Sequence, residues 1–157
     1  MFGKYANQRR RERGARKAET FDFLGFTHIC GKSRAGQFLL TRHTVAKRMR
    51  AKLHETKLEL QRRRHQPIPE QGAWLRSVVR GYFAYHAVPT NTFAMSDFRT
   101  QVVRCWHKAL RRRSQRDKTD WVRMNRLVNR WLPPVRVLHP WPTERFDART
   151  QGKSPVR

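Results

Sequence analysis

Acidic residues are scarce in this chain of 157 residues, which has 11 aspartates and glutamates against 36 lysines and arginines. The formal net charge of +25 would repel itself in a compact state, so we expect a polyanionic partner. The five aspartates never stand together and fall on different predicted elements, whereas metal-dependent phosphoryl chemistry needs converging carboxylates. The sequence therefore predicts a binding protein rather than an enzyme, with no catalytic residue, no metal site and no cofactor.

Cysteine and long hydrophobic runs are scarce too. Cys30 and Cys105 lie far apart and neither belongs to a CxxC pair, which argues against a disulfide framework or a zinc site. The first residues lack the apolar run of a signal peptide, and no stretch is long enough to cross a bilayer. We therefore expect a reduced, cytoplasmic protein with no membrane partner.

The apolar residues that are present predict a β-hairpin over residues 21–42. Two apolar runs, Phe21–Cys30 and Phe38–Leu40, flank a glycine-bounded turn. Taken as one strand, the first run is apolar on both faces, with Phe21 and Phe23 on one side and Phe26 on the other. One of those faces would need cover from outside the hairpin.

Helical periodicity predicts three or four helices within residues 43–131. Thr44 is the expected N-cap of the first helix, and Gly81 is expected to lie close to a neighbouring backbone because glycine is costly inside a helix. Aromatic residues in helical phase are expected to pack in the core rather than stack on bases. The expected helices cover residues 44–64, 70–86, 91–113 and 119–131.

The predicted fold is mostly α, with an N-terminal β-hairpin followed by a three- to four-helix bundle and extended basic termini. Residues 1–20 are expected to form a flexible basic arm, and residues 132–157 an extended, proline-rich basic tail. Basic clusters at residues 62–64, at Arg76 with Arg80, and at residues 111–116 fall at helix ends or opposite the apolar stripes. Arginine offers phosphates a planar fork of donors, so these clusters indicate nucleic-acid binding; a merely solvated face is a weak explanation for all of them together.

Several motifs resemble group II intron reverse transcriptases. Phe23-Leu24-Gly25-Phe26, after a basic lead-in, is similar to the last conserved block of the reverse transcriptase region. The stretch from Trp74 to Tyr85 resembles the hallmark helix of the maturase-specific domain, also called domain X or the thumb. Residues 111–115, 131–134 and 139–140 continue the pattern of bacterial members. The resemblance extends over about residues 21–147.

The resemblance implies a thumb-like, RNA-binding maturase domain of the bacterial cytoplasm. Such a domain assists intron RNA folding and splicing through phosphate and shape recognition, while the intron supplies the chemistry. The fingers and palm, with their Tyr-X-Asp-Asp element, are missing and no HNH-type endonuclease follows, so neither activity is expected. The expected RNA-binding residues are Lys47, Arg48, Arg50, Arg62, Arg63, Arg64, Arg76, Arg80, Arg111, Arg112 and Arg113.

Three alternatives remain open. The chain could be the C-terminal part of a split reverse transcriptase, docking on a separate fingers-palm chain, which a strand that is apolar on both faces would favour. It could also be a non-functional remnant of a mobile element. The third alternative is a general basic RNA chaperone without preference for folded intron RNA.

Overall fold

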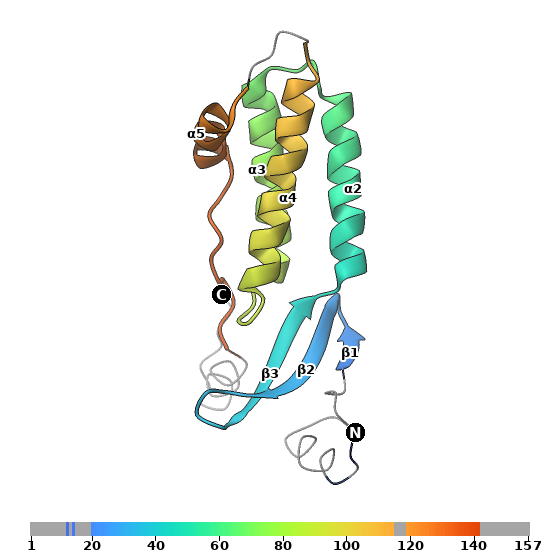
Figure 1. The fold of residues 1–157 in the computed structure, drawn as a ribbon, viewed down its shortest axis with the longest axis vertical. Helices are drawn as coiled ribbons and strands as arrows, with labels where there is room; N and C mark the ends of the chain where they lie inside the picture. Colours follow the sequence, from blue (N-terminus) through green and yellow to red (C-terminus); the bar gives the residue numbers. More distant parts are fainter. Residues whose placement is uncertain (1–11, 13, 15–19, 115–118, 142–157) are drawn as a thin grey trace, which may run out of the picture.

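A small sheet leads into a bundle of helices in the computed structural model, which describes residues 12, 14, 20–114 and 119–141 (Figure 1). The fold is mostly α with an N-terminal hairpin, as predicted. Most of the predicted arm at 1–20, residues 115 and 116 of the basic cluster and residues 142–157 of the tail lie outside the described residues, as do residues 117 and 118. The elements are β1 (Thr20–Phe23), β2 (Phe26–Lys32), β3 (Phe38–Thr44), α2 (Ala46–Arg62), α3 (Ile68–His86), α4 (Thr92–Arg111) and α5 (Trp121–Trp131).

The sheet has three antiparallel strands in the order β1-β2-β3, so the prediction of one continuous strand over residues 21–30 is wrong. The chain reverses at Leu24 and Gly25, whose φ angles are 48° and 81°. Positive φ at both central residues is typical of the two-residue type I′ turn, whose twist matches that of the flanking strands. The Phe-Leu-Gly-Phe motif is therefore a tight hairpin turn.

This reversal also changes which face of the sheet carries the apolar side chains. Phe21 pairs with His28 and Phe23 pairs with Phe26, and directly paired residues share a face. The expectation that Phe21 and Phe23 lie on the face opposite Phe26 is therefore wrong. Phe26 and Cys30 are buried, whereas Phe21 and Phe23 are exposed.

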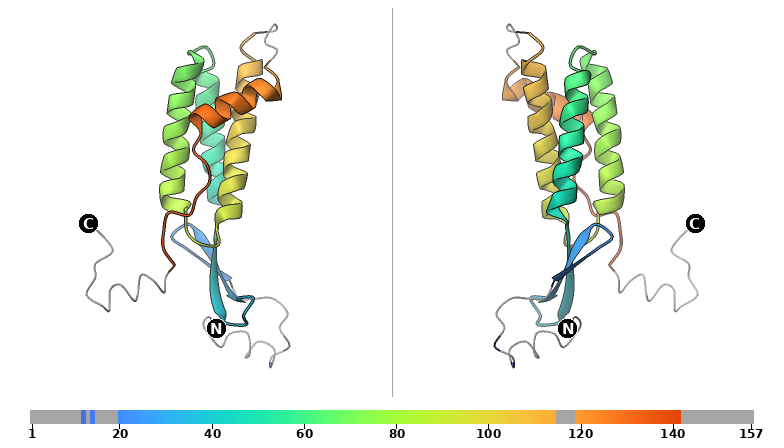
Figure 2. Two further views of the ribbon diagram at one scale, coloured as in Figure 1. Left: turned by 90° about the vertical axis from the view of Figure 1, so that its left-hand side faces the viewer. Right: turned by 90° about the vertical axis from the view of Figure 1, so that its right-hand side faces the viewer.

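Three long helices stand side by side above the sheet, and α5 runs across them near the ends remote from the sheet (Figure 2). Helices α2 and α4 both lead away from the sheet, and α3 returns towards it (Figure 1). The ring of Tyr82 stacks on that of Phe98 with centroids 3.6 Å apart, and the fully buried Trp106 donates from Nε1 to Oε1 of Gln71 at 3.1 Å. The predicted core role of these aromatic residues is confirmed.

The junction between sheet and bundle depends on Asn91, which is fully buried. Its Oδ1 accepts from the backbone N–H of Thr44 at 2.9 Å, and its Nδ2 donates to Oγ1 of Thr44 and to the carbonyl of His86. Thr44 is the last residue of β3, and the N-cap position belongs to Val45, which makes no side-chain cap bond. The prediction of Thr44 as N-cap is therefore wrong.

The close approach expected at Gly81 occurs instead at Gly72. A Cβ added at Gly81 would meet nothing within 4 Å, so that prediction is wrong. A Cβ at Gly72 would lie 2.5 Å from the ring of Trp131, the last residue of α5. Gly72 thus lets α5 dock on α3.

Candidate nucleic-acid interface

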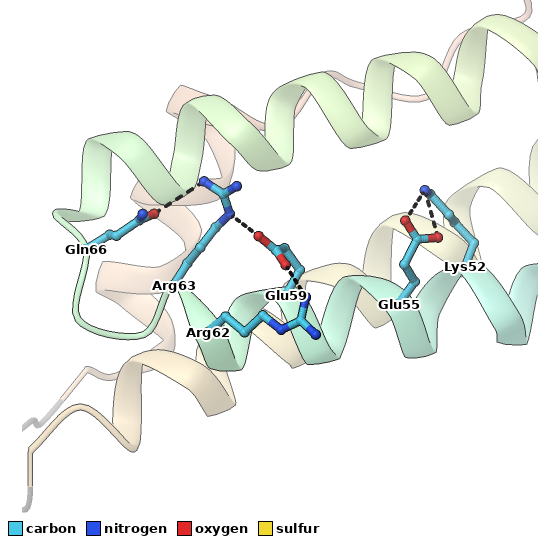
Figure 3. A network of polar contacts seen from close by, with 6 residues as sticks. All are labelled: Lys52, Glu55, Glu59, Arg62, Arg63 and Gln66. Carbon is cyan, nitrogen blue, oxygen red and sulfur yellow. Dashed lines mark hydrogen bonds and ion pairs between the residues drawn. The ribbon is translucent and has the colours of Figure 1, made fainter.

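Two of the predicted RNA-binding arginines contribute to the fold of α2. Arg63 donates from Nε to Glu59 at 2.7 Å, and Nη1 of Arg62 lies 3.5 Å from the same carboxylate (Figure 3). The guanidinium of Arg63 also lies 5.1 Å from the ring centroid of Trp74 on α3. Arg63 therefore has an internal role, which does not depend on a ligand.

Arg76 also binds within the protein. Its Nε and Nη2 donate to the carbonyls of Trp131 and Arg130 at 3.1 and 2.8 Å, and its guanidinium lies 5.1 Å from the ring centroid of Trp131. A cation suits the carbonyl end of a helix, where unpaired carbonyls carry partial negative charge. Arg76 therefore fastens α5 to α3.

The other predicted cations are distributed over both ends of the bundle. Lys47, Arg48 and Arg50 are exposed near the start of α2, beside the sheet, whereas Arg111 and Arg112 are exposed at the far end of α4. The structure therefore does not bring the predicted residues together into one compact patch.

A groove between α2 and α3 contains Arg48. It has a volume of about 570 Å³ and is lined by Arg48, Lys52, Gly81, Tyr82 and Tyr85, among others. Tyr85 stacks on Phe26 and its hydroxyl donates to the carbonyl of Leu24, so the groove begins beside the Phe-Leu-Gly-Phe turn. Aromatic and cationic side chains in one groove are a combination that single-stranded nucleic acid can use.

Arg80 borders a second groove on the other side of α3. This groove is about 440 Å³ and also includes Phe83, Pro133, Pro134 and Arg136. The segment after α5 forms its wall, because the carbonyl of Pro133 accepts from Nε of Arg99 at 3.0 Å. Arg136 was not among the residues predicted from the sequence. It lines the same groove as Arg80 because the segment after α5 runs back along α3.

Arg64 and Arg112 line a smaller pocket between α2 and α4, of about 180 Å³. The sequence prediction missed the other two cations of this pocket, Lys57 and Lys108. The signal that could have found them is their spacing in the sequence, because Lys57 comes seven residues before Arg64 and Lys108 four residues before Arg112.

The histidines of the described region mostly serve the fold. Nε2 of His107 lies 2.9 Å from the carbonyl of Thr119, and Nε2 of His139 lies 2.8 Å from that of Ala84. Burial lowers the pKa of His86, against the opposing effect of its hydrogen bond to the carbonyl of Tyr82. Among the described residues, no group of three or more His, Cys, Asp or Glu side chains is placed to hold a metal ion.

The two cysteines are free thiols in different surroundings. Cys30 is buried in the sheet, and Cys105 is partly buried on α4. Burial raises the pKa of the Cys105 thiol, while the charges of Lys57 and Lys108 act to lower it.

Comparisons with known proteins give no relative for this arrangement. No family model matches the chain, and neither the curated proteins nor the solved structures include a match. Within the described ranges, no helix has both the length and the apolar character needed to cross a bilayer. The described surface offers cationic grooves around a packed aromatic core.

Proposed function

We propose that this protein binds structured RNA through the phosphate backbone and the shape of the RNA. The observation that carries the proposal is the excess of exposed cations around a folded core. Lys47, Arg50, Arg80, Arg111 and Arg112 are exposed and form no ion pair with any described residue. Unpaired cations on a rigid scaffold release counterions from a polyanion, which is the main source of nucleic-acid affinity.

The more specific proposal is that the RNA is a group II intron and that the protein is a maturase domain of the bacterial cytoplasm. It is supported by the motifs in the sequence, of which Phe23–Phe26 and Trp74–Tyr85 are the most specific. Their structural setting is compatible with a shared role, since Tyr85 at the end of one motif hydrogen bonds to Leu24 in the other. The mechanism is electrostatic and conformational: the protein favours the compact RNA, and the RNA performs splicing.

A competition assay tests this proposal. Labelled group II intron RNA is bound at two salt concentrations, and unlabelled intron RNA is compared with an unrelated duplex of equal length as competitor. Maturase function predicts that the intron RNA competes much better, most clearly at the higher salt, because phosphate contacts alone do not discriminate. Equal competition would indicate a general RNA chaperone, and absence of binding at both concentrations would favour a non-functional remnant.

A second candidate function is docking on a separate reverse transcriptase chain that supplies fingers and palm. The strand that is apolar on both faces, which favoured this alternative, is absent from the sheet, but Phe23 and Leu24 are 57% and 64% exposed. Both line a groove of about 420 Å³ that continues onto Tyr85 and Val88 of the bundle. Exposed apolar groups beside a groove are typical of a protein interface.

Co-purification distinguishes this candidate from a stand-alone RNA-binding protein. A fingers-palm chain should be retained by the wild-type protein and by Phe93→Ser, because Phe93, at the start of α4, is 84% exposed but does not line this groove. Phe23→Ser should abolish retention, and primer extension should require both chains. Retention that is equal for both variants would contradict docking through this groove.

A further inference from the structure

The pocket between α2 and α4 is built from two helix faces that meet along their length. Lys57 and Gln61 of α2 and Arg64 of the turn after it line one side of the pocket. Cys105, Lys108 and Ala109 of α4 and its C-cap residue Arg112 line the other. Steps of three and four residues place side chains on one face of a helix, so both sets point into the same interhelical groove. The two helices lead away from the sheet side by side, which brings their cationic last turns together (Figure 1).

The charges in this pocket are all of one sign. Two lysines and two arginines line it, and no acidic residue is among its described lining residues. Glu59 on α2 is the nearest acidic residue in sequence to Arg64, and it is already paired with Arg62 and Arg63. None of the four lining cations forms an ion pair within the described part of the chain.

One donor of a residue that lines the pocket lacks a partner. Nε of Arg64 is buried and makes no hydrogen bond in the described structure. A buried donor without an acceptor costs free energy, and a charged donor costs more. Arg64, Lys108 and Arg112 lie in or just after the last turns of their helices, where a cation is favourable. Together with Lys57 they nevertheless leave four like charges that repel each other. An anion bound among these four cations would relieve their mutual repulsion.

We propose that this pocket binds one phosphate group of the RNA backbone. The inference rests on the proposed RNA binding and adds a defined contact to it. The pocket volume of about 180 Å³ is below the range of roughly 300–1,000 Å³ that is usual for sites holding whole small molecules. It suits a phosphate rather than a nucleoside. The guanidinium forks of Arg64 and Arg112 supply directional donors, and Lys57 and Lys108 supply point charges.

Cys105 can report on occupancy, because it is one of the residues that line the pocket. Cys30, which is only 2% exposed in the sheet, is the internal control. Alkylation by iodoacetamide is followed for each cysteine by peptide mass spectrometry, at mildly alkaline pH because burial raises the pKa of Cys105. The full chain is labelled alone, with structured RNA, and with inorganic phosphate, at ionic strength matched with sodium chloride.

The proposal predicts that RNA and inorganic phosphate both slow the alkylation of Cys105, and that neither changes that of Cys30. Unchanged labelling of Cys105 in bound RNA complexes would overturn the proposal. Protection by inorganic phosphate alone would overturn it as well, since the pocket would then be a small-anion site that RNA does not enter.

RNA bound elsewhere could also shield Cys105, and a pair of charge-matched variants distinguishes that case from a phosphate bound in the pocket. Lys57→Gln with Lys108→Gln removes two charges from the pocket, and Arg123→Gln with Arg126→Gln removes two exposed charges from α5. The pocket variant should bind RNA about tenfold more weakly than the α5 variant, and the slope of log affinity against log salt should fall by about 0.7–0.9 for one lost phosphate. If both variants still bind RNA with equal affinity, phosphate binding in the pocket is refuted, whereas the proposed RNA-binding function is not. Absence of RNA binding to the wild-type chain would refute both.

Discussion

Two glycine-to-alanine substitutions in α3 should change stability in opposite directions. At Gly81 an added methyl group meets open space, so Gly81→Ala should stabilise the protein by about 0.5–1 kcal/mol through helix propensity alone. At Gly72 the same methyl group would lie 2.5 Å from the ring of Trp131. That distance is too short for any contact, so the indole must move.

The cost at Gly72 follows from what holds Trp131 in place. Its ring lies close to the guanidinium groups of Arg76 and Arg130, and it packs against the buried core while partly exposed. Truncating a fully buried large aromatic residue costs about 3–5 kcal/mol, so displacing a partly buried one should cost about 2–3 kcal/mol. After subtracting the propensity gain, Gly72→Ala should destabilise the protein by about 1–2 kcal/mol.

Urea unfolding followed by far-ultraviolet circular dichroism measures both effects in one experiment. The two variants should differ by about 2–3 kcal/mol in free energy of unfolding, with wild type between them. Each variant carries the same chemical change in the same helix, so differences in intrinsic propensity cancel. If Gly72→Ala is as stable as Gly81→Ala, the docking of α5 on α3 described above is refuted.

Three further predictions concern the junction, the pH dependence and the charge. Asn91→Ala should destabilise the protein by about 2–3 kcal/mol in urea unfolding, because it leaves the buried N–H of Thr44 without an acceptor. A loss below about 0.5 kcal/mol would contradict the role of Asn91 in holding the sheet to the bundle. Because the pKa of His86 is lower in the folded state, its contribution to stability should be complete above about pH 6.5 and should be lost as the pH falls below it. His86→Gln should therefore weaken the fall in thermal stability between pH 7 and 5, and an identical fall in both proteins would exclude His86 as its source. Replacing Arg111, Arg112 and Arg113 by glutamine should make RNA binding less dependent on salt concentration. An unchanged slope of log affinity against log salt would exclude a role of these arginines in RNA binding.

The helical part of the fold could be predicted from sequence because its signal is local. Apolar residues at three- and four-residue spacing place Phe98, Val102 and Trp106 on one face, and all three are fully buried in the structure. The tight turn at Leu24 and Gly25 was missed because leucine is unusual at positive φ, and a run of apolar residues on both sides of it reads as one strand.

The candidate site could be predicted less well, because a cation's role depends on neighbours that are distant in sequence. Arg76 lies in a basic helix and looks available to RNA, yet its partners are the carbonyls of Arg130 and Trp131, more than 50 residues away. Lys57 and Lys108 look like isolated surface lysines, and only the packing of α2 against α4 brings them to one pocket. The glycine that packs against another element could not be predicted either, because the neighbour of Gly72 is Trp131, which is distant in sequence.

The salt dependence of RNA binding by the wild-type chain tests the central claim most directly. Fluorescence anisotropy of a labelled structured RNA, titrated with protein at 50–500 mM salt, gives the slope of log affinity against log salt. Contact with about 6–10 phosphates predicts a straight line with a slope of about −4 to −9. A slope near zero, or no binding at the lowest salt, would mean that the cations around the aromatic core do not form an RNA-binding surface.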